Sequence, residues 1–173
     1  MKQSPPLLVR LLLALTSRYS IVLINVLLVA IGVLSLKELA PLLFNAQDNT
    51  KEMEDIVENL GVILIGYGVA IEERHAFMNI FRLYPEHEDK TQAAVDHHCH
   101  EYGLCYLLLG LFMEVCVALV KLPNSIVDTS QEELLLFGIG AVLLAWSAWL
   151  MLRHCAVLLR PGRFDAPEGH GLG

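Results

Sequence analysis

Residues 58–82, ENLGVILIGYGVAIEERHAFMNIFR, and residues 97–121, HHCHEYGLCYLLLGLFMEVCVALVK, decide the fold of this chain. Both stretches are mostly apolar and long enough for helices, and the polar segment LYPEHEDKTQAAVD (residues 83–96) joins them. Both also place carboxylates and imidazoles where lipid disfavours them, because burying an ionisable group in a bilayer is costly. The two stretches therefore predict a membrane-embedded helical hairpin with a functional site on it.

Apolar residues make up 55% of the chain and gather in four blocks, at residues 21–36, 60–71, 103–120 and 134–152. A helix needs about 20 mostly apolar residues to cross ~30 Å of hydrocarbon. With flanking residues, the blocks predict an all-α, integral membrane four-helix bundle with spans near residues 19–38, 58–82, 101–121 and 133–154. Residues 1–160 would form one domain, with residues 6–16 either interfacial or part of the first span. The Gly/Pro-rich residues 161–173 are expected to be a disordered tail.

The placement of basic residues predicts the orientation of the four spans. With the N-terminus inside, nine of the twelve Lys and Arg residues fall on the inner side, and the outer loops keep only Lys37, Lys51 and Lys121. An excess of Lys and Arg in short loops marks the cytoplasmic side. Both termini are therefore expected in the cytoplasm, and the hairpin formed by the second and third helices extends into it. This pattern is typical of a bacterial inner-membrane protein.

Composition also argues against other classes of protein. The net charge of −7 and the lack of a basic stripe predict no nucleic-acid partner. None of the four cysteines lies in an outer loop, so a disulfide framework is not expected. The sequence has no phosphate-binding Gly-rich loop, no Gly-x-Ser-x-Gly and no Cys-x-x-Cys, and it names no reaction. The expected partners are the lipid bilayer and either further copies of the chain or a larger membrane complex.

Polar and small residues follow one face of each hairpin helix. Residues three, four and seven apart share a helix face, which on the second helix aligns Glu58, Gly61, Ile65, Gly68, Glu72, His75 and Asn79. The matching face of the third helix carries His97, His100, Gly103, Leu104, Leu107, Leu111 and Glu114, with Glu101 at its edge. Counting from the hairpin tip at ~1.5 Å per residue predicts His75 level with His100, Glu72 near Glu101, and Glu58 near Glu114.

The cluster nearest the tip has the residue types of a metal site. Glu72 and His75 present an oxygen and a nitrogen on one face, opposite His97, His100 and Glu101. Di-iron and di-manganese helix bundles use Glu and Glu-x-x-His ligands in this way, although this chain has one Glu-x-x-His instead of two. Mixed imidazole and carboxylate sets suit Fe, Mn or Zn. We therefore expect these five residues to bind a metal in a site that is open to redox chemistry.

A haem is the alternative cofactor for the same cluster. His75 and His100 would be its axial ligands, one from each antiparallel helix. Gly68 and Gly103 would leave room for the porphyrin between the two helices. No sequence motif supports this variant specifically.

Two functions that need no metal also stay open. Glu58, Glu72 and Glu114 form a string of titratable groups of the kind that proton or cation relays use, and facing carboxylates can share a proton. Alternatively, the Glu and His side chains lie among lipid headgroups without a chemical role. The chain would then be a structural or accessory subunit of a larger membrane complex.

Overall fold

The computed structural model describes residues 7, 13–14, 16–44, 46–81, 83, 90–121 and 133–160. This part of the chain is all-α, as predicted, and contains no strand. Its helices are α2 (Arg18–Phe44), α3 (Ala46–Glu72), α4 (Arg74–Ile80), α5 (Lys90–Lys121) and α6 (Glu133–Leu159). The predicted tail at residues 161–173, and most of residues 6–16, lie outside the described residues.

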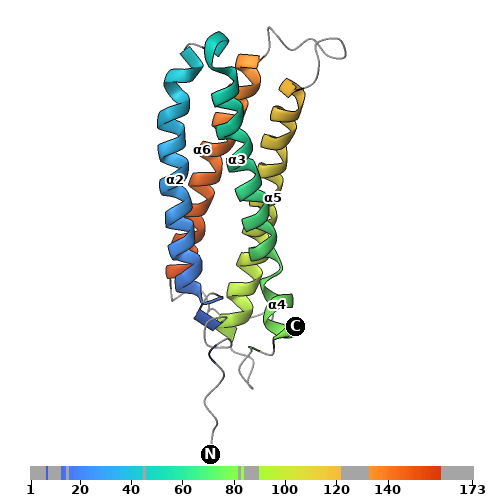
Figure 1. Ribbon diagram of the computed structural model, residues 1–173. Helices are drawn as coiled ribbons and strands as arrows, with labels where there is room; N and C mark the ends of the chain where they lie inside the picture. The colour runs from blue at the N-terminus through green and yellow to red at the C-terminus, as the bar shows by residue number, and fades with distance from the viewer. Residues whose placement is uncertain are drawn as a thin grey trace, which may run out of the picture.

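The four long helices stand side by side, and the short α4 follows α3 at one end of the molecule (Figure 1). The most extensive contact joins α3 and α5, followed by the contacts of α6 with α2 and with α5. One apolar core takes residues from all four long helices, among them Leu39, Leu60, Tyr106, Met113 and Phe137. Side chains that are distant in the sequence therefore meet along the axis of this assembly.

Three helices are long and apolar enough to cross a membrane, over Arg18–Leu43, Gln92–Lys121 and Leu134–Leu159. Large apolar side chains such as Leu23, Leu111 and Val142 are exposed on their outer faces, as contact with lipid requires. The second predicted span, α3, is not among the three, because charges at Glu58 and Glu72 leave only residues 59–71 uncharged.

The first long helix extends further than the sequence predicts. The predicted span ends near residue 38, whereas α2 continues through Pro41 to Phe44. Proline lacks a backbone N–H and removes one helical hydrogen bond. Near the end of a helix this loss affects a single turn, so α2 continues past the proline.

The second helix is interrupted where the sequence predicts continuity over residues 58–82. Glu73 separates α3 from α4 with φ −83° and ψ 10°, a conformation outside the regular helix. Hydrogen bonds still run on both sides, because the Glu73 N–H donates to Val69 O at 3.0 Å and the Phe77 N–H to Glu73 O at 2.9 Å. The interruption is therefore a local change of helix geometry, and Arg74 immediately after it is buried.

Candidate functional site

Four glycines set the distance between α3 and α5. Gly61 on α3 faces Gly110 on α5, and Gly68 on α3 faces Gly103 on α5. These two facing glycine pairs are regularly spaced, because the two glycines within each helix are seven residues apart. A Cβ added to Gly103 would lie 2.6 Å from the backbone nitrogen of Glu72, closer than real Cβ atoms approach backbone. Small residues at such positions let two helix backbones touch. The glycine pairs therefore fix the register in which the side chains of α3 and α5 meet.

The same contact removes the room predicted for a haem. The sequence suggests that Gly68 and Gly103 leave space for a porphyrin between His75 and His100. A Cβ on Gly68 would instead lie 2.8 Å from the carbonyl oxygen of Gly103, so backbone fills this space. That part of the prediction is wrong, because facing glycines draw helices together and do not hold them apart.

Glu72 and His100 meet at the end of the helix pair nearest α4. Glu72 Oε1 lies 3.1 Å from His100 Nδ1. Glu72 is 24% exposed and His100 is 59% exposed, so the pair is accessible from outside the helix interface. The predicted neighbour of Glu72 was Glu101, one residue further along α5. The pair is thus built from two of the predicted ligands on different helices.

His97 and Glu101 form a second pair on the same part of α5. His97 Nε2 lies 3.4 Å from Glu101 Oε1, and both side chains are exposed. His98 Nδ1 lies 3.5 Å from the other oxygen of Glu101. Four of the five predicted ligands are therefore placed in two separate pairs, one within α5 and one between α5 and α3. No three of these side chains, all of which the structure describes, bring their donor atoms within 4.8 Å of one another.

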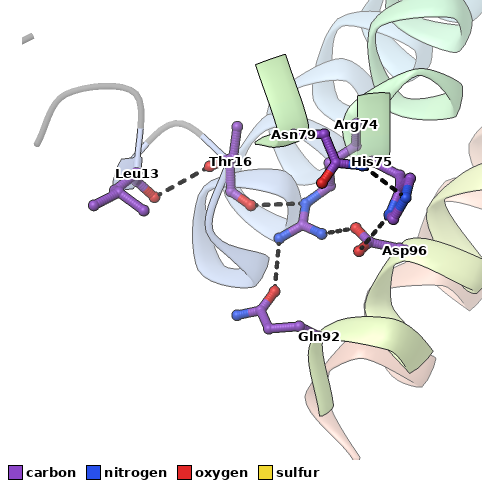
Figure 2. A network of polar contacts seen from close by, with 7 residues as sticks. All are labelled: Leu13, Thr16, Arg74, His75, Asn79, Gln92 and Asp96. Atoms are coloured by element: carbon purple, nitrogen blue, oxygen red, sulfur yellow. Dashed lines mark hydrogen bonds and ion pairs between the residues drawn. The ribbon is translucent and has the colours of Figure 1, made fainter. Parts of the chain in front are cut away.

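His75, the fifth predicted ligand, has other partners (Figure 2). Its Nδ1 lies 3.5 Å from Asp96 Oδ2, and its Nε2 lies 2.9 Å from Asn79 Nδ2. The sequence predicts His75 level with His100, but the structure places it beside Asp96, about one turn away along α5. The glycine pairs set this register, and counting residues from the hairpin tip does not capture them.

Arg74 connects three segments of the chain at this end (Figure 2). Its guanidinium pairs with the Asp96 carboxylate, and it donates to Gln92 Oε1 at 3.0 Å and to the Thr16 carbonyl oxygen at 2.9 Å. Arg74 is 4% exposed and Asp96 is 9% exposed. A buried ion pair needs additional hydrogen bonds of this kind to offset its desolvation. The sequence did not single out Asp96, because it lies in the stretch assigned to the polar tip.

Glu58 and Glu114 approach each other at the opposite end, in agreement with the predicted register. Glu114 Oε1 lies over Gly61, 2.6 Å from the position of an added Cβ, and Gly61 is one turn from Glu58. This oxygen is buried and has no hydrogen-bond partner within the described part of the chain. Lys121 Nζ lies 2.7 Å from Glu58 and 2.9 Å from Glu54, so it offsets part of the negative charge of these two carboxylates.

The described residues contain one group of three potential metal ligands with donor atoms within 4.8 Å of one another, namely Glu54, Asp55 and Glu58. The group lies in the first half of α3, away from the predicted ligands, and Lys121 contacts two of its carboxylates. Acidic clusters of this type are common on protein surfaces. Its geometry alone therefore assigns it no role.

A buried polar network lies where the four long helices meet, and the sequence did not predict it. Asn25 Nδ2 lies 3.2 Å and the Tyr106 hydroxyl 3.1 Å from the same atom, His154 Nδ1. The Tyr67 hydroxyl donates to Asn25 Oδ1 at 2.8 Å. The Tyr102 ring stacks on the imidazole with centroids 4.5 Å apart. Each of α2, α3, α5 and α6 thus contributes to one set of contacts.

The network also determines the tautomer of His154. The Asn25 Nδ2 group can only donate, so its contact assigns the acceptor role to Nδ1 and the proton to Nε2. His154 is fully buried, and its Nε2 has no hydrogen-bond partner within the described residues. The one signal in the sequence that pointed to this network was an isolated polar residue in or beside an apolar block, as at Asn25 and His154. Neither residue shares a helix with its partners, so spacing along the sequence could not connect them.

Comparison with known proteins leaves the function to be argued from this geometry. No protein-family model matches the chain, and the curated proteins and solved structures provide no match either. The arrangement of side chains at the α4 end of α3 and α5 is therefore the basis on which a function can be proposed.

Proposed function

We propose that the chain is a four-span protein of a bacterial inner membrane with both termini in the cytoplasm, and that it binds a divalent transition-metal ion at the inner ends of α3 and α5. In this arrangement α3 crosses the membrane as the second span. Glu58 and Glu72 are ~21 Å apart along α3, at ~1.5 Å per residue, against ~30 Å of hydrocarbon. Contacts with Lys121 and His100 reduce the cost of holding these carboxylates near the hydrocarbon.

Glu72, His97, His100 and Glu101 are the proposed ligands. Zinc bonds to nitrogen and oxygen of ~2.0–2.2 Å imply ~3.4 Å between neighbouring ligand atoms of a tetrahedral site. The two pairs have separations of 3.1 Å and 3.4 Å. Each pair therefore already has the spacing of one edge of a coordination tetrahedron.

Side-chain rotation would bring the two pairs onto one ion. His97 and His100 are three residues apart on α5, which places them on one face, ~4.5 Å apart along the axis. His97, His100 and Glu101 are exposed, so solvent leaves them free to rotate. Mixed imidazole and carboxylate ligands suit Zn, Fe or Mn. His75 is left out of the ligand set, because Asp96 and Asn79 contact both of its ring nitrogens.

The contact between Glu72 and His100 across the glycine-lined helix interface carries this proposal. A relay along the same face is less well supported. Between Glu114 and Glu72 the two helices meet through backbone at both glycine pairs, and the side chain that packs there, Ile65, is apolar and cannot pass a proton.

Isothermal titration of the purified protein with Zn²⁺ tests the proposal. We expect one ion per chain, and a loss of affinity of at least ~tenfold, about 1.4 kcal/mol, in Glu72→Gln and in His100→Ala. His75→Ala is the matched control and should retain the affinity of the wild type. An absence of saturable binding, or an equal loss in the control variant, would contradict the proposal.

A further inference from the structure

A groove with a volume of about 350 Å³ lies between the start of α2 and the end of α3 with the adjoining α4. Ile24, Val69 and Phe77 contribute apolar walls, and Thr16, Glu73 and Arg74 are among its polar lining residues. Val69 and Phe77 are also exposed on the molecular surface, so the groove opens sideways. A largely apolar site with a few polar groups is the usual form of a small-molecule pocket.

The polar residues of the groove lie where α2 enters the proposed membrane. Thr16 lies two residues before Arg18, where α2 begins. The Arg18 guanidinium lies 4.8 Å from the centre of the exposed Tyr19 ring and donates to its hydroxyl at 2.8 Å. Arginine and tyrosine at the end of a span are typical of the headgroup layer. The polar part of the groove is therefore at headgroup level, and Ile24 extends the groove toward the hydrocarbon.

We propose that this groove binds one acyl chain of phosphatidylethanolamine from the inner leaflet. The volume lies at the low end of the ~300–1,000 Å³ typical of ligand sites, which suits a single chain. The headgroup matches the charges at this end of the fold, with its ammonium at Glu73, an exposed lining residue, and its phosphate at Arg18, which begins α2 two residues after the lining residue Thr16. Arg74 is excluded as the phosphate ligand, because Asp96, Gln92 and Thr16 already occupy its guanidinium.

The inference depends on the membrane orientation proposed for the chain but not on the metal site. Phosphatidylethanolamine with a photoreactive group on the acyl chain, added to the full chain in nanodiscs, provides the test. We expect cross-links to map to the peptides that contain Ile24 and Val69. Ala70→Phe fills the groove and should lower this labelling several-fold. Val62→Phe is the control, because Val62 is exposed on the same helix but does not line the groove.

The headgroup is tested separately with phosphatidylglycerol carrying the same photoreactive chain. The wild type should be labelled more strongly by phosphatidylethanolamine than by phosphatidylglycerol. Glu73→Gln keeps Ala70, and therefore the apolar groove, unchanged, and it should remove this preference. Equal labelling of the Ala70→Phe and Val62→Phe variants would mean that the groove holds only bulk lipid, and would overturn the proposal. Equal or stronger labelling of the wild type by phosphatidylglycerol would also overturn it.

Discussion

Glu72 on α3 and His100 on α5 lie 3.1 Å apart because Gly68 and Gly103 bring the backbones of the two helices into contact one turn away. Main-chain packing thus fixes the backbone positions of the two residues, while the exposed imidazole of His100 stays free to rotate. Preorganisation of this kind reduces the entropy lost when a ligand binds. The glycine interface and the proposed metal site therefore form one structural unit.

Replacing Gly103 by alanine should destabilise the protein. The added Cβ would lie 2.6 Å from the Glu72 backbone nitrogen and 2.8 Å from the Gly68 carbonyl oxygen, and neither atom can rotate away. Overpacking of this kind costs ~1–3 kcal/mol, so the melting temperature followed by circular dichroism in detergent should fall. Gly66→Ala is the control, since nothing lies within 4 Å of its added Cβ. A melting temperature for Gly103→Ala at or above that of Gly66→Ala would contradict the interface.

Tyr67→Phe should weaken the packing of α3 against α2. The substitution removes the donor to Asn25 Oδ1 and leaves that oxygen buried without this partner. Hydrogen bonds between membrane helices contribute about 1 kcal/mol, and denaturant unfolding in mixed micelles should show a loss of that size. Tyr19→Phe is the control, because the Tyr19 hydroxyl is exposed. Equal stability of the two variants would show that the network contributes nothing.

Removal of Arg74 should cost more than removal of Arg74 and Asp96 together. Arg74→Leu leaves the Asp96 carboxylate buried without its main counter-charge, and breaking a buried pair costs ~3–5 kcal/mol. Arg74→Leu combined with Asp96→Leu removes both charges and should recover part of that loss. Hydrogen exchange of the α4 amides reports the effect locally. If the double variant exchanges faster than the single one, the ion pair is not what holds α4 in place.

The proposed orientation predicts which residues can be labelled from outside the cell. Thr50→Cys at the start of α3 should react with a membrane-impermeant maleimide on intact cells, whereas Asn79→Cys on α4 should react only after lysis. The unmodified chain controls for its four native cysteines, all of which are free thiols. If Asn79→Cys reacts on intact cells and Thr50→Cys does not, the orientation is the opposite of the one proposed.

Periodicity was sufficient to predict part of this structure from the sequence. The faces of the two hairpin helices follow from spacing of three, four and seven residues, and counting residues from the hairpin tip predicts the proximity of Glu58 to Glu114. The exact register did not follow, because it depends on backbone contact at the four glycines. The sequence marked Gly68 and Gly103 as small but did not show whether they face each other or a cofactor.

The buried contacts could not be predicted for a different reason. Asn25 and His154 are 129 residues apart in the sequence, and each stands within a separate apolar helix. Asp96 lies near the start of α5, which begins at Lys90, and no spacing in the sequence indicated that Arg74 would be its partner. Pairing of isolated polar residues depends on which helices are neighbours, and the spacing within one helix carries no information about that.

The absorption spectrum of the purified protein during titration with Co²⁺ tests the metal site most directly, because the visible bands of Co²⁺ report coordination geometry. We predict bands typical of a tetrahedral ion that saturate at one Co²⁺ per chain. The bands should disappear in Glu72→Gln and His100→Ala and persist in His75→Ala and in Glu58→Gln, which removes a carboxylate from the acidic cluster at the other end of α3. A spectrum that stays octahedral, or that depends on Glu58 and not on Glu72, would contradict a metal site at the inner end of α3 and α5.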